Sequence, residues 1–267
     1  MIREPVVSGQ FYPGRSNVLE KTIEDFDPKE SSKISAKGII LPHAGYPYSG
    51  RVATVTVSKV LPRKRLVILG PNHTGLGENF ALWSQGSWEI PFGKLNIDEE
   101  LAQLILTKGN YIKEDKEAHL QEHSIEVELP ILYHFFGEFK FVPIACKMAS
   151  LEKYRAVANQ IVSALKEVKD DIFFVASTDL THYESDQAAR KKDRFAIEAM
   201  VNLDEQELIN KINSMHITMC GVAPVAILIS CLKQLGAKKS QVALYQTSGD
   251  SSGDYSAVVG YVGMIIN

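Results

Sequence analysis

Short, continuous apolar runs alternate along this chain with longer stretches in which apolar residues recur at helical spacing. Runs at residues 38–41, 66–69 and 172–176 are bounded by Gly, Pro or polar residues, which is typical of strands buried on both faces. Further strands are predicted at residues 139–145, 242–247 and 257–266, and helices at residues 18–26, 51–61, 99–107, 151–168, 187–201 and 222–235. This alternation indicates a layered α/β fold.

Residues that commonly begin helices precede several helical stretches, namely Asp98, Ser150, Asp186 and Asp204. The segment at residues 75–94 is rich in Gly, Asn and Pro, which indicates a hairpin or an irregular flap. The segment at residues 247–254 is rich in turn formers, and is either a loop over one rim of the sheet or an ordinary connection to the last strand.

Composition and charge narrow the class of protein. The 267 residues, 45% of them hydrophobic, suffice for one sizeable core, so we interpret residues 1–267 as a single domain. A formal net charge of −3 and a pI near 6.2 provide no attraction to nucleic acid or anionic membranes. The amino terminus lacks a secretory pattern, no apolar stretch approaches the roughly 20 residues that cross a bilayer, and three scattered cysteines form no disulfide framework. We therefore expect a soluble, cytoplasmic protein with reduced thiols.

Candidate metal ligands lie just beyond the three central runs. His43 follows the first run, His73 the second and Asp179 the third. Because ligands of open α/β sheets bind beyond the carboxyl ends of strands, we expect these side chains to meet at one rim. Two neutral imidazoles from neighbouring strands suit iron, copper, zinc or nickel. The alternative is that each imidazole only hydrogen-bonds loop backbone.

Two further positions are candidates for acid/base and thiol chemistry. A carboxylate beside an imidazole orients it and raises its basicity, so Asp179 makes His182 a candidate general acid/base; the alternative is that Asp179 caps a turn. Cys220 precedes an apolar helix, whose positive end lowers a thiol pKa and favours a thiolate ligand or nucleophile. The alternative is a small buried hydrophobe, which is our interpretation of Cys146 and Cys231.

The segment at residues 118–130 is rich in His and Glu. If it is helical, His123 and Glu126 lie on one face at a spacing used in carboxylate-bridged metal sites, and Glu122 pairs with Glu126. The alternative is that the acids cap a first turn. We favour a supporting role for His123 and interpret the other histidines as surface or structural residues, namely His119, His134 and His216.

Seven motifs, in order over nearly the whole chain, resemble those of the Memo family. They are Arg3-Glu-Pro-Val-Val-Ser-Gly-Gln-Phe-Tyr-Pro13, Pro42-His-Ala-Gly-Tyr46 with Ser49-Gly50, Gly70-Pro-Asn-His73, Glu122-His-Ser-Ile-Glu126, Ser177-Thr-Asp-Leu-Thr-His182, Met219-Cys-Gly221 and Tyr255-Ser256. The resemblance implies a single-domain layered α/β/α fold with a central mixed, largely parallel sheet, similar to class III extradiol dioxygenases. Those enzymes hold non-haem iron through two histidines and one carboxylate.

The resemblance also implies roles for individual residues. His43 and His73 match the two histidine ligands, and Cys220 takes the position of the acidic ligand. His182, with Asp179 beside it, matches the acid/base histidine. Apart from the resemblance, we expect His123 and Tyr46 to support the pocket; the alternative for Tyr46 is packing in the core. A thiolate in place of a carboxylate makes the site softer, which favours Cu(I) or Zn(II) and still permits Fe(II).

Three classes of function remain open. The first is a metal-dependent, dioxygenase-like oxidoreductase with iron or copper, and the second is a non-catalytic module that binds a metal, a metabolite or a peptide. The third is a hydrolase or transferase with Cys220 as nucleophile and His182 as base. Animal members of the family are associated with cell-motility signalling and with copper or iron, and microbial relatives with AMMECR-like and radical-SAM partners. The ligand is therefore expected to be a small molecule or peptide, with no nucleic acid or membrane partner.

Overall fold

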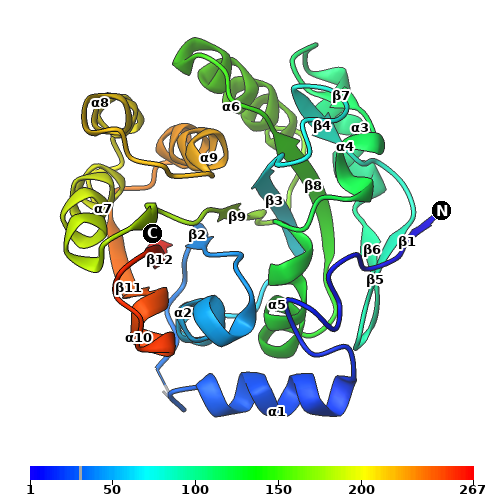
Figure 1. Cartoon of the computed structure of the whole chain (residues 1–267). Coiled ribbons are helices and arrows are strands. Elements are labelled where there is room, and N and C mark those ends of the chain that lie inside the picture. The colour runs from blue at the N-terminus through cyan, green and yellow to red at the C-terminus, as the bar shows by residue number, and fades with distance from the viewer. Residues whose placement is uncertain (30–31) are drawn as a thin grey trace.

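A mixed sheet runs through the middle of the molecule in the computed structural model, which describes residues 1–29 and 32–267 (Figure 1). Within these residues the sheet has twelve strands. Nine of them follow one another in the order β1 (Ile2–Arg3), β5 (Ser87–Ile90), β6 (Gly93–Ile97), β8 (Lys140–Cys146), β3 (Arg65–Pro71), β9 (Phe173–Ser177), β2 (Gly38–Leu41), β12 (Val258–Ile266) and β10 (His182–Glu184). The others lie beside this path: β4 (Phe80–Leu82), β7 (Lys113–Glu114) and β11 (Ser240–Thr247).

The centre of the sheet is parallel. β8, β3, β9 and β2 pair in parallel, with Val67 of β3 opposite Val142 on one side and Phe174 on the other. Antiparallel pairs flank this centre, where β12 joins β2, β10 and β11, and where β5 joins β6. The apolar residues of the central strands are buried on both faces, as a sheet between two helical layers requires. The predicted layered α/β fold with a largely parallel sheet is confirmed.

Helices cover both faces of the sheet (Figure 1). One face carries α3 (Glu99–Thr107), α6 (Leu151–Leu165) and α9 (Val222–Gln234), and the other carries α1 (Ser16–Phe26), α2 (Tyr46–Ser58) and α5 (Leu129–Phe136). α7 (Asp186–Val201) and α8 (Glu205–Met215) flank the β12 end, and three short elements complete the set: α4 (Glu117–Leu120), the 3₁₀ turn η1 (Glu126–Glu128) and α10 (Ser248–Ser252). α9 is apolar and buried all round because it packs between the sheet and α6.

Local capping chemistry explains most helix starts. Three of the four predicted caps accept a backbone N–H three residues on, namely Asp98, Ser150 and Asp204. The prediction for Asp186 is wrong, because Ser185 takes the cap position and the Asp186 carboxylate instead accepts a hydrogen bond from Arg190 at 2.7 Å. That ion pair anchors the first turn of α7 in place of a capping bond.

Some boundaries differ from the predicted ones. α2 begins at Tyr46 instead of residue 51, because Pro47 fits the first turn of a helix, where its missing N–H has no intrahelical partner to lose. α8 was not predicted as a helix, although its cap was. The segment at residues 75–94 contains β4 and most of the β5–β6 hairpin, and residues 248–252 form α10 on the connection between β11 and β12.

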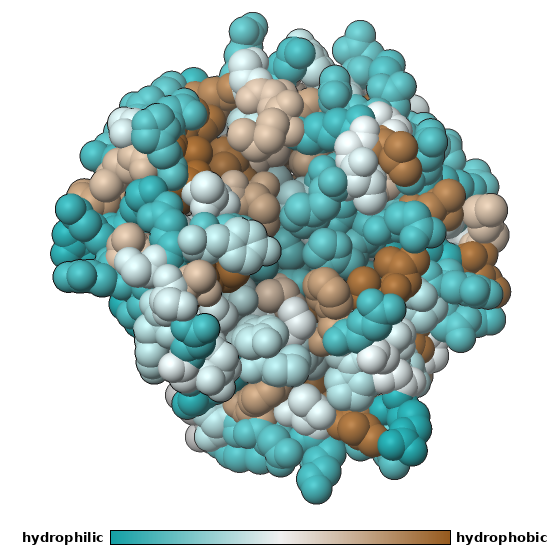
Figure 2. All heavy atoms as spheres, viewed as in Figure 1, coloured by the Kyte–Doolittle hydropathy of each residue, from teal (hydrophilic) through white to brown (hydrophobic). Residues whose placement is uncertain are grey.

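Polar residues dominate the face of the molecule in Figure 2, where hydrophobic residues form small, separated patches. The large apolar side chains gather in one core cluster that spans the sheet and both helical layers. No helix within the described ranges is long and apolar enough to cross a bilayer.

Candidate metal centre

Three neighbouring parallel strands end at one rim of the sheet. His43, His73 and Asp179 each lie two residues beyond the end of a strand, after β2, β3 and β9 respectively. These strands are adjacent in the order β3-β9-β2, so their carboxyl ends meet. The backbone N–H of His43 donates to Asp179 Oδ1 at 3.0 Å, and the rings of His43 and His73 lie 5.2 Å apart. The structure thus brings together three side chains that lie far apart in the sequence.

A third imidazole joins this pair. The ligand nitrogens of His43, His73 and His123 all lie within 4.8 Å of one another. The His123 ring stacks on His73 at 4.8 Å, and Phe11 packs edge-on against it at 4.9 Å. His43 is buried, His123 is half-buried and His73 is exposed, so the group opens to solvent on one side. His123, predicted to have a supporting role, therefore lies within the imidazole group itself.

The Glu122 carboxylate holds two of these imidazoles. Its Oε1 lies 2.9 Å from His73 Nδ1 and 3.4 Å from His123 Nδ1, and accepts the backbone N–H groups of His123 and Ser124 at 2.9 Å. Burial alone would raise the pKa of Glu122, but the hydrogen bond and charge of His73 and the charge of His123 lower it to about 2. Burial acts to lower the pKa of His73, but the hydrogen bond and charge of Glu122 raise it. In its neutral form, His73 donates Nδ1–H to this carboxylate and keeps the Nε2 lone pair for a ligand. A role for Glu122 in the site was not predicted, and its position next to His123 was the available signal.

Ser177 fixes the imidazole of His43. Its hydroxyl donates to the Ser124 carbonyl at 2.9 Å and lies 2.6 Å from His43 Nδ1. Because its single proton is used on Ser124, the hydroxyl accepts from Nδ1–H, and Nε2 of His43 keeps its lone pair. Burial, followed by the neighbouring His123 and His73, lowers the pKa of His43 well below its ordinary value. His43 is therefore a neutral imidazole, the form that binds metals.

Cys220 lies just before the start of α9 and contacts His43. Its Sγ lies 3.4 Å from His43 Nε2 and accepts the backbone N–H of Asp179 at 3.2 Å. The expected lowering of the thiol pKa is wrong, because burial and the charge of Asp179 raise the pKa of Cys220. The raised pKa keeps this sulfur protonated, as a thiol.

Asp179 faces His43 instead of His182. Its Oδ2 lies 3.9 Å from His43 Nε2, and burial raises the pKa of Asp179 to about 7. His182 Nδ1 contacts the backbone carbonyls of Leu180 and Thr218 at 2.7 and 2.9 Å. The prediction that Asp179 orients His182 is wrong, since backbone carbonyls do so. His182 is half-buried and lies near enough to lower the pKa of His43.

The segment between α4 and α5 is not a continuous helix. Its only regular element is the short 3₁₀ turn η1. Glu126 consequently forms a buried ion pair with Arg3 at 2.8 Å, which ties the amino-terminal segment to η1. The helical interpretation of this segment, in which His123 and Glu126 share one face, is wrong. Tyr46 is buried and donates to the Val127 carbonyl at 2.9 Å, so its hydroxyl stabilises η1.

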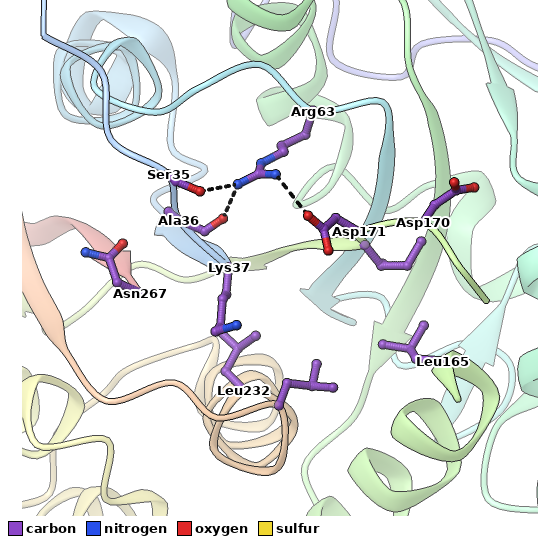
Figure 3. A pocket seen from close by; sticks show the side chains of 11 residues that line it. Ser35, Ala36, Lys37, Arg63, Leu165, Asp170, Asp171, Leu232 and Asn267 are labelled. Atoms are coloured by element: carbon purple, nitrogen blue, oxygen red, sulfur yellow. Dashed lines mark hydrogen bonds and ion pairs between the residues drawn. The ribbon is translucent and has the colours of Figure 1, made fainter. Parts of the chain in front are cut away.

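A separate cavity of about 320 Å³ lies at the opposite, amino-terminal ends of β2, β3 and β9 (Figure 3). Arg63 crosses its edge, donating to the Ser35 hydroxyl and the Ala36 carbonyl at 3.0 and 2.8 Å and pairing with Asp171 at 3.8 Å. Its lining contains none of the imidazoles described above. The cavity is therefore distinct from the candidate metal centre.

The donor set and its spacing fit a transition metal. Imidazole and thiol groups suit iron, copper and zinc, whereas magnesium and calcium prefer oxygen. Nitrogen and sulfur ligands of one tetrahedral ion lie about 3.5 Å apart, given metal–ligand distances of about 2.0 and 2.3 Å. The separation of His43 Nε2 and Cys220 Sγ, 3.4 Å, is close to that value.

Comparison with known proteins agrees with the sequence motifs. The family model for "Memo-like protein" matches residues 3–265. MEMO1 family proteins of Methanopyrus kandleri and Aquifex aeolicus are 42% and 44% identical to this chain over alignments that cover 99% of it and 99% and 98% of theirs. An uncharacterized protein from Escherichia coli K12 has a similar structure, with a TM-score of 0.52 and 12% identity over 85% of this chain and 98% of that chain, and this likeness shows the fold alone. Because the match to the family extends over nearly the full length, this chain belongs to the Memo family.

Proposed function

We propose that the protein is a metal-dependent oxidoreductase that binds iron or copper through His43, His73 and Cys220, with His123 beside them. The observation that carries this proposal is the meeting of three imidazoles within 4.8 Å, with the Cys220 thiol 3.4 Å from the most buried of them. Iron or copper would supply one-electron redox chemistry at an open coordination position. The exposed side of the group, at His73, gives a substrate access.

The residues around the group prepare it for that role. Glu122 and Ser177 fix the Nδ1 sides of His73 and His43, so that both present Nε2. Asp179, with its pKa raised to about 7 by burial, holds or releases a proton near His43 at neutral pH. His182 is a second acid/base group at the same rim, fixed by backbone carbonyls.

Elemental analysis of tag-free protein purified without oxygen tests this proposal. We expect about one equivalent of iron or copper in the wild type and its loss in His43→Ala and Cys220→Ala, with unchanged circular dichroism. His216→Asn is the matched control, because His216 is exposed in a left-handed cap conformation that Asn adopts readily. Equal metal content in all four proteins, or a wild type that cannot be loaded, would overturn the proposal.

The contact between Cys220 and His43 also favours a second candidate, a cysteine nucleophile. Its base would be His43 and not His182, because His43 is the imidazole in contact with the sulfur. The raised pKa of Cys220 opposes this chemistry. Alkylation of Cys220 at pH 7 faster than that of the same thiol in unfolded protein would support it, and slower alkylation would exclude it.

A further inference from the structure

Two carbonyl groups and one hydroxyl hold His182. Its Nδ1 lies 2.7 Å from the Leu180 carbonyl oxygen and 2.9 Å from that of Thr218. Its backbone N–H donates to the Thr218 hydroxyl at 2.7 Å, and this hydroxyl donates to the His182 carbonyl at 3.5 Å. Thr218 therefore contacts His182 at both the backbone and the ring.

These contacts determine which ring nitrogen of His182 carries the proton. A carbonyl oxygen accepts hydrogen bonds and has no proton to give, so Nδ1 is the donor to both carbonyls. In a neutral imidazole one nitrogen is a donor and the other an acceptor. Neutral His182 is therefore the Nδ1–H tautomer, and its Nε2 keeps the lone pair.

The two carbonyls differ in what holds them in place. Leu180 is two residues from His182, whereas Thr218 lies 36 residues away in the connection between α8 and α9. That connection is bound at a second point, where the Cys220 N–H donates to the Asp179 carbonyl at 3.3 Å and the Asp179 N–H donates to Cys220 Sγ at 3.2 Å. Loss of the Thr218 hydroxyl would release the part of the connection that lies against His182.

We propose that Thr218 is a positioning residue for His182: its hydroxyl fixes the backbone of His182 and its carbonyl accepts Nδ1–H, so that a proton accepted by His182 goes onto Nε2. The inference rests on the proposed function, in which His182 is an acid/base group, and it names the atom that acts. The same connection carries Cys220, so one short segment supplies the thiol and positions this histidine. If Thr218 served stability alone, its replacement would leave the tautomer of His182 unchanged.

Three substitutions of Thr218 separate these roles. Thr218→Ser keeps the hydroxyl, Thr218→Val keeps the shape without the hydroxyl, and Thr218→Ala keeps neither. Thr107→Val is the matched control, because Thr107 on α3 is also exposed and its hydroxyl also bonds a backbone carbonyl, that of Leu104 at 2.8 Å. The side-chain ¹⁵N spectrum of metal-free protein at about pH 8.5, above the ordinary histidine pKa, reports the tautomer. Loss of signals in His182→Gln assigns them to His182, and urea unfolding reports stability.

We expect Nδ1–H to be the predominant tautomer of His182 in the wild type. In Thr218→Val and Thr218→Ala, the ratio of Nδ1–H to Nε2–H should fall by about fivefold, the value of one hydrogen bond, because the Thr218 carbonyl is no longer held against Nδ1. Thr218→Ser and Thr107→Val should match the wild type.

A predominant Nε2–H tautomer in the wild type, or the wild-type ratio in Thr218→Val and Thr218→Ala, would overturn the inference. Lower stability in urea without a change of tautomer would leave Thr218 a structural role alone. Because the spectra are recorded without metal, a protein that cannot be loaded with iron or copper would refute the metal site, while the spectra would still decide the role of Thr218.

Discussion

Replacing Glu122 by Gln tests whether one buried carboxylate organises the metal centre. The carboxylate accepts the backbone N–H of His73 as well as Nδ1 of that residue, and the backbone N–H groups of His123 and Ser124. An amide has the same shape but no charge and only one accepting oxygen, so it cannot serve all four donors. We expect both imidazoles to lose their fixed orientation and the fold to lose stability.

The lowered pKa of Glu122 gives the size of the effect. It falls from an ordinary 4.5 to about 2 in the folded protein. Each pKa unit corresponds to about 1.4 kcal/mol, so the ionised group stabilises the fold by about 3 kcal/mol at pH 7. Because the folded-state pKa is the lower one, this stability is present above pH 4.5 and is lost as the pH falls toward 2, with about 1.4 kcal/mol remaining at pH 3. If the site binds a metal as proposed, loss of this outer carboxylate would also weaken that binding by about 10- to 100-fold.

Urea unfolding of metal-free protein at pH 7 and pH 3 measures this effect. With a slope of about 3 kcal/mol per molar urea, the midpoint of Glu122→Gln should fall by about 1 M at pH 7 and by less than half of that at pH 3. Glu207→Gln is the control, because Glu207 forms an exposed ion pair with Lys211 and should leave the midpoint near that of the wild type. An equal shift at both pH values, or none at pH 7, would refute the reasoning.

Two other predictions concern groups outside the imidazole cluster. Burial, in the first place, lowers the pKa of His119 from 6.5 to about 4, so stability present above pH 6.5 is lost as the pH falls to 4, by about 3 kcal/mol. Between pH 6.5 and pH 4, the unfolding free energy of His119→Leu should therefore fall by about 3 kcal/mol less than that of the wild type. The same pH dependence in both proteins would contradict the lowered pKa of His119. A Cβ at Gly221 would lie 2.3 Å from the Ser177 carbonyl oxygen and from Thr178 Cβ, so Gly221→Ala should lose about 3 kcal/mol in urea unfolding, and a variant as stable as the wild type would show that α9 can shift.

The positions of His43, His73 and Asp179 could be predicted from the sequence because each depends on a strand that the apolar pattern reveals. Parallel central strands end at a common rim, so a polar residue two positions beyond each strand is placed by the fold itself. The same argument located Cys220, whose position depends on the start of an apolar helix. In these cases the same apolar pattern predicts both the secondary-structure element and the position of the site residue next to it.

The positions of Glu122 and His123 in the site could not be predicted from the sequence, because their segment shows neither helical nor strand periodicity. Glu122 Oε1 accepts the backbone N–H groups of the next two residues, His123 and Ser124. Such local side-chain bonds compete with helical hydrogen bonds, and here they replace them between α4 and η1. Helical spacing therefore paired His123 with Glu126, which in the fold binds Arg3 instead.

The protonation of Cys220 depends on two opposing effects, the helix N-terminus and burial. The position of Cys220 at the helix start does not determine which of them is larger. A helix N-terminus stabilises a nearby anion by about 0.3–1 kcal/mol, whereas burial shifts a pKa by up to about 3–5 units, which is several times larger. The sulfur lies against His43 and the backbone of Asp179, where burial and the Asp179 charge keep the proton on the thiol. A coordinated cation reverses that balance, because a thiol bound to a metal is deprotonated outright. Under the proposed function, Cys220 would therefore become an anion through metal binding and not through the fold alone.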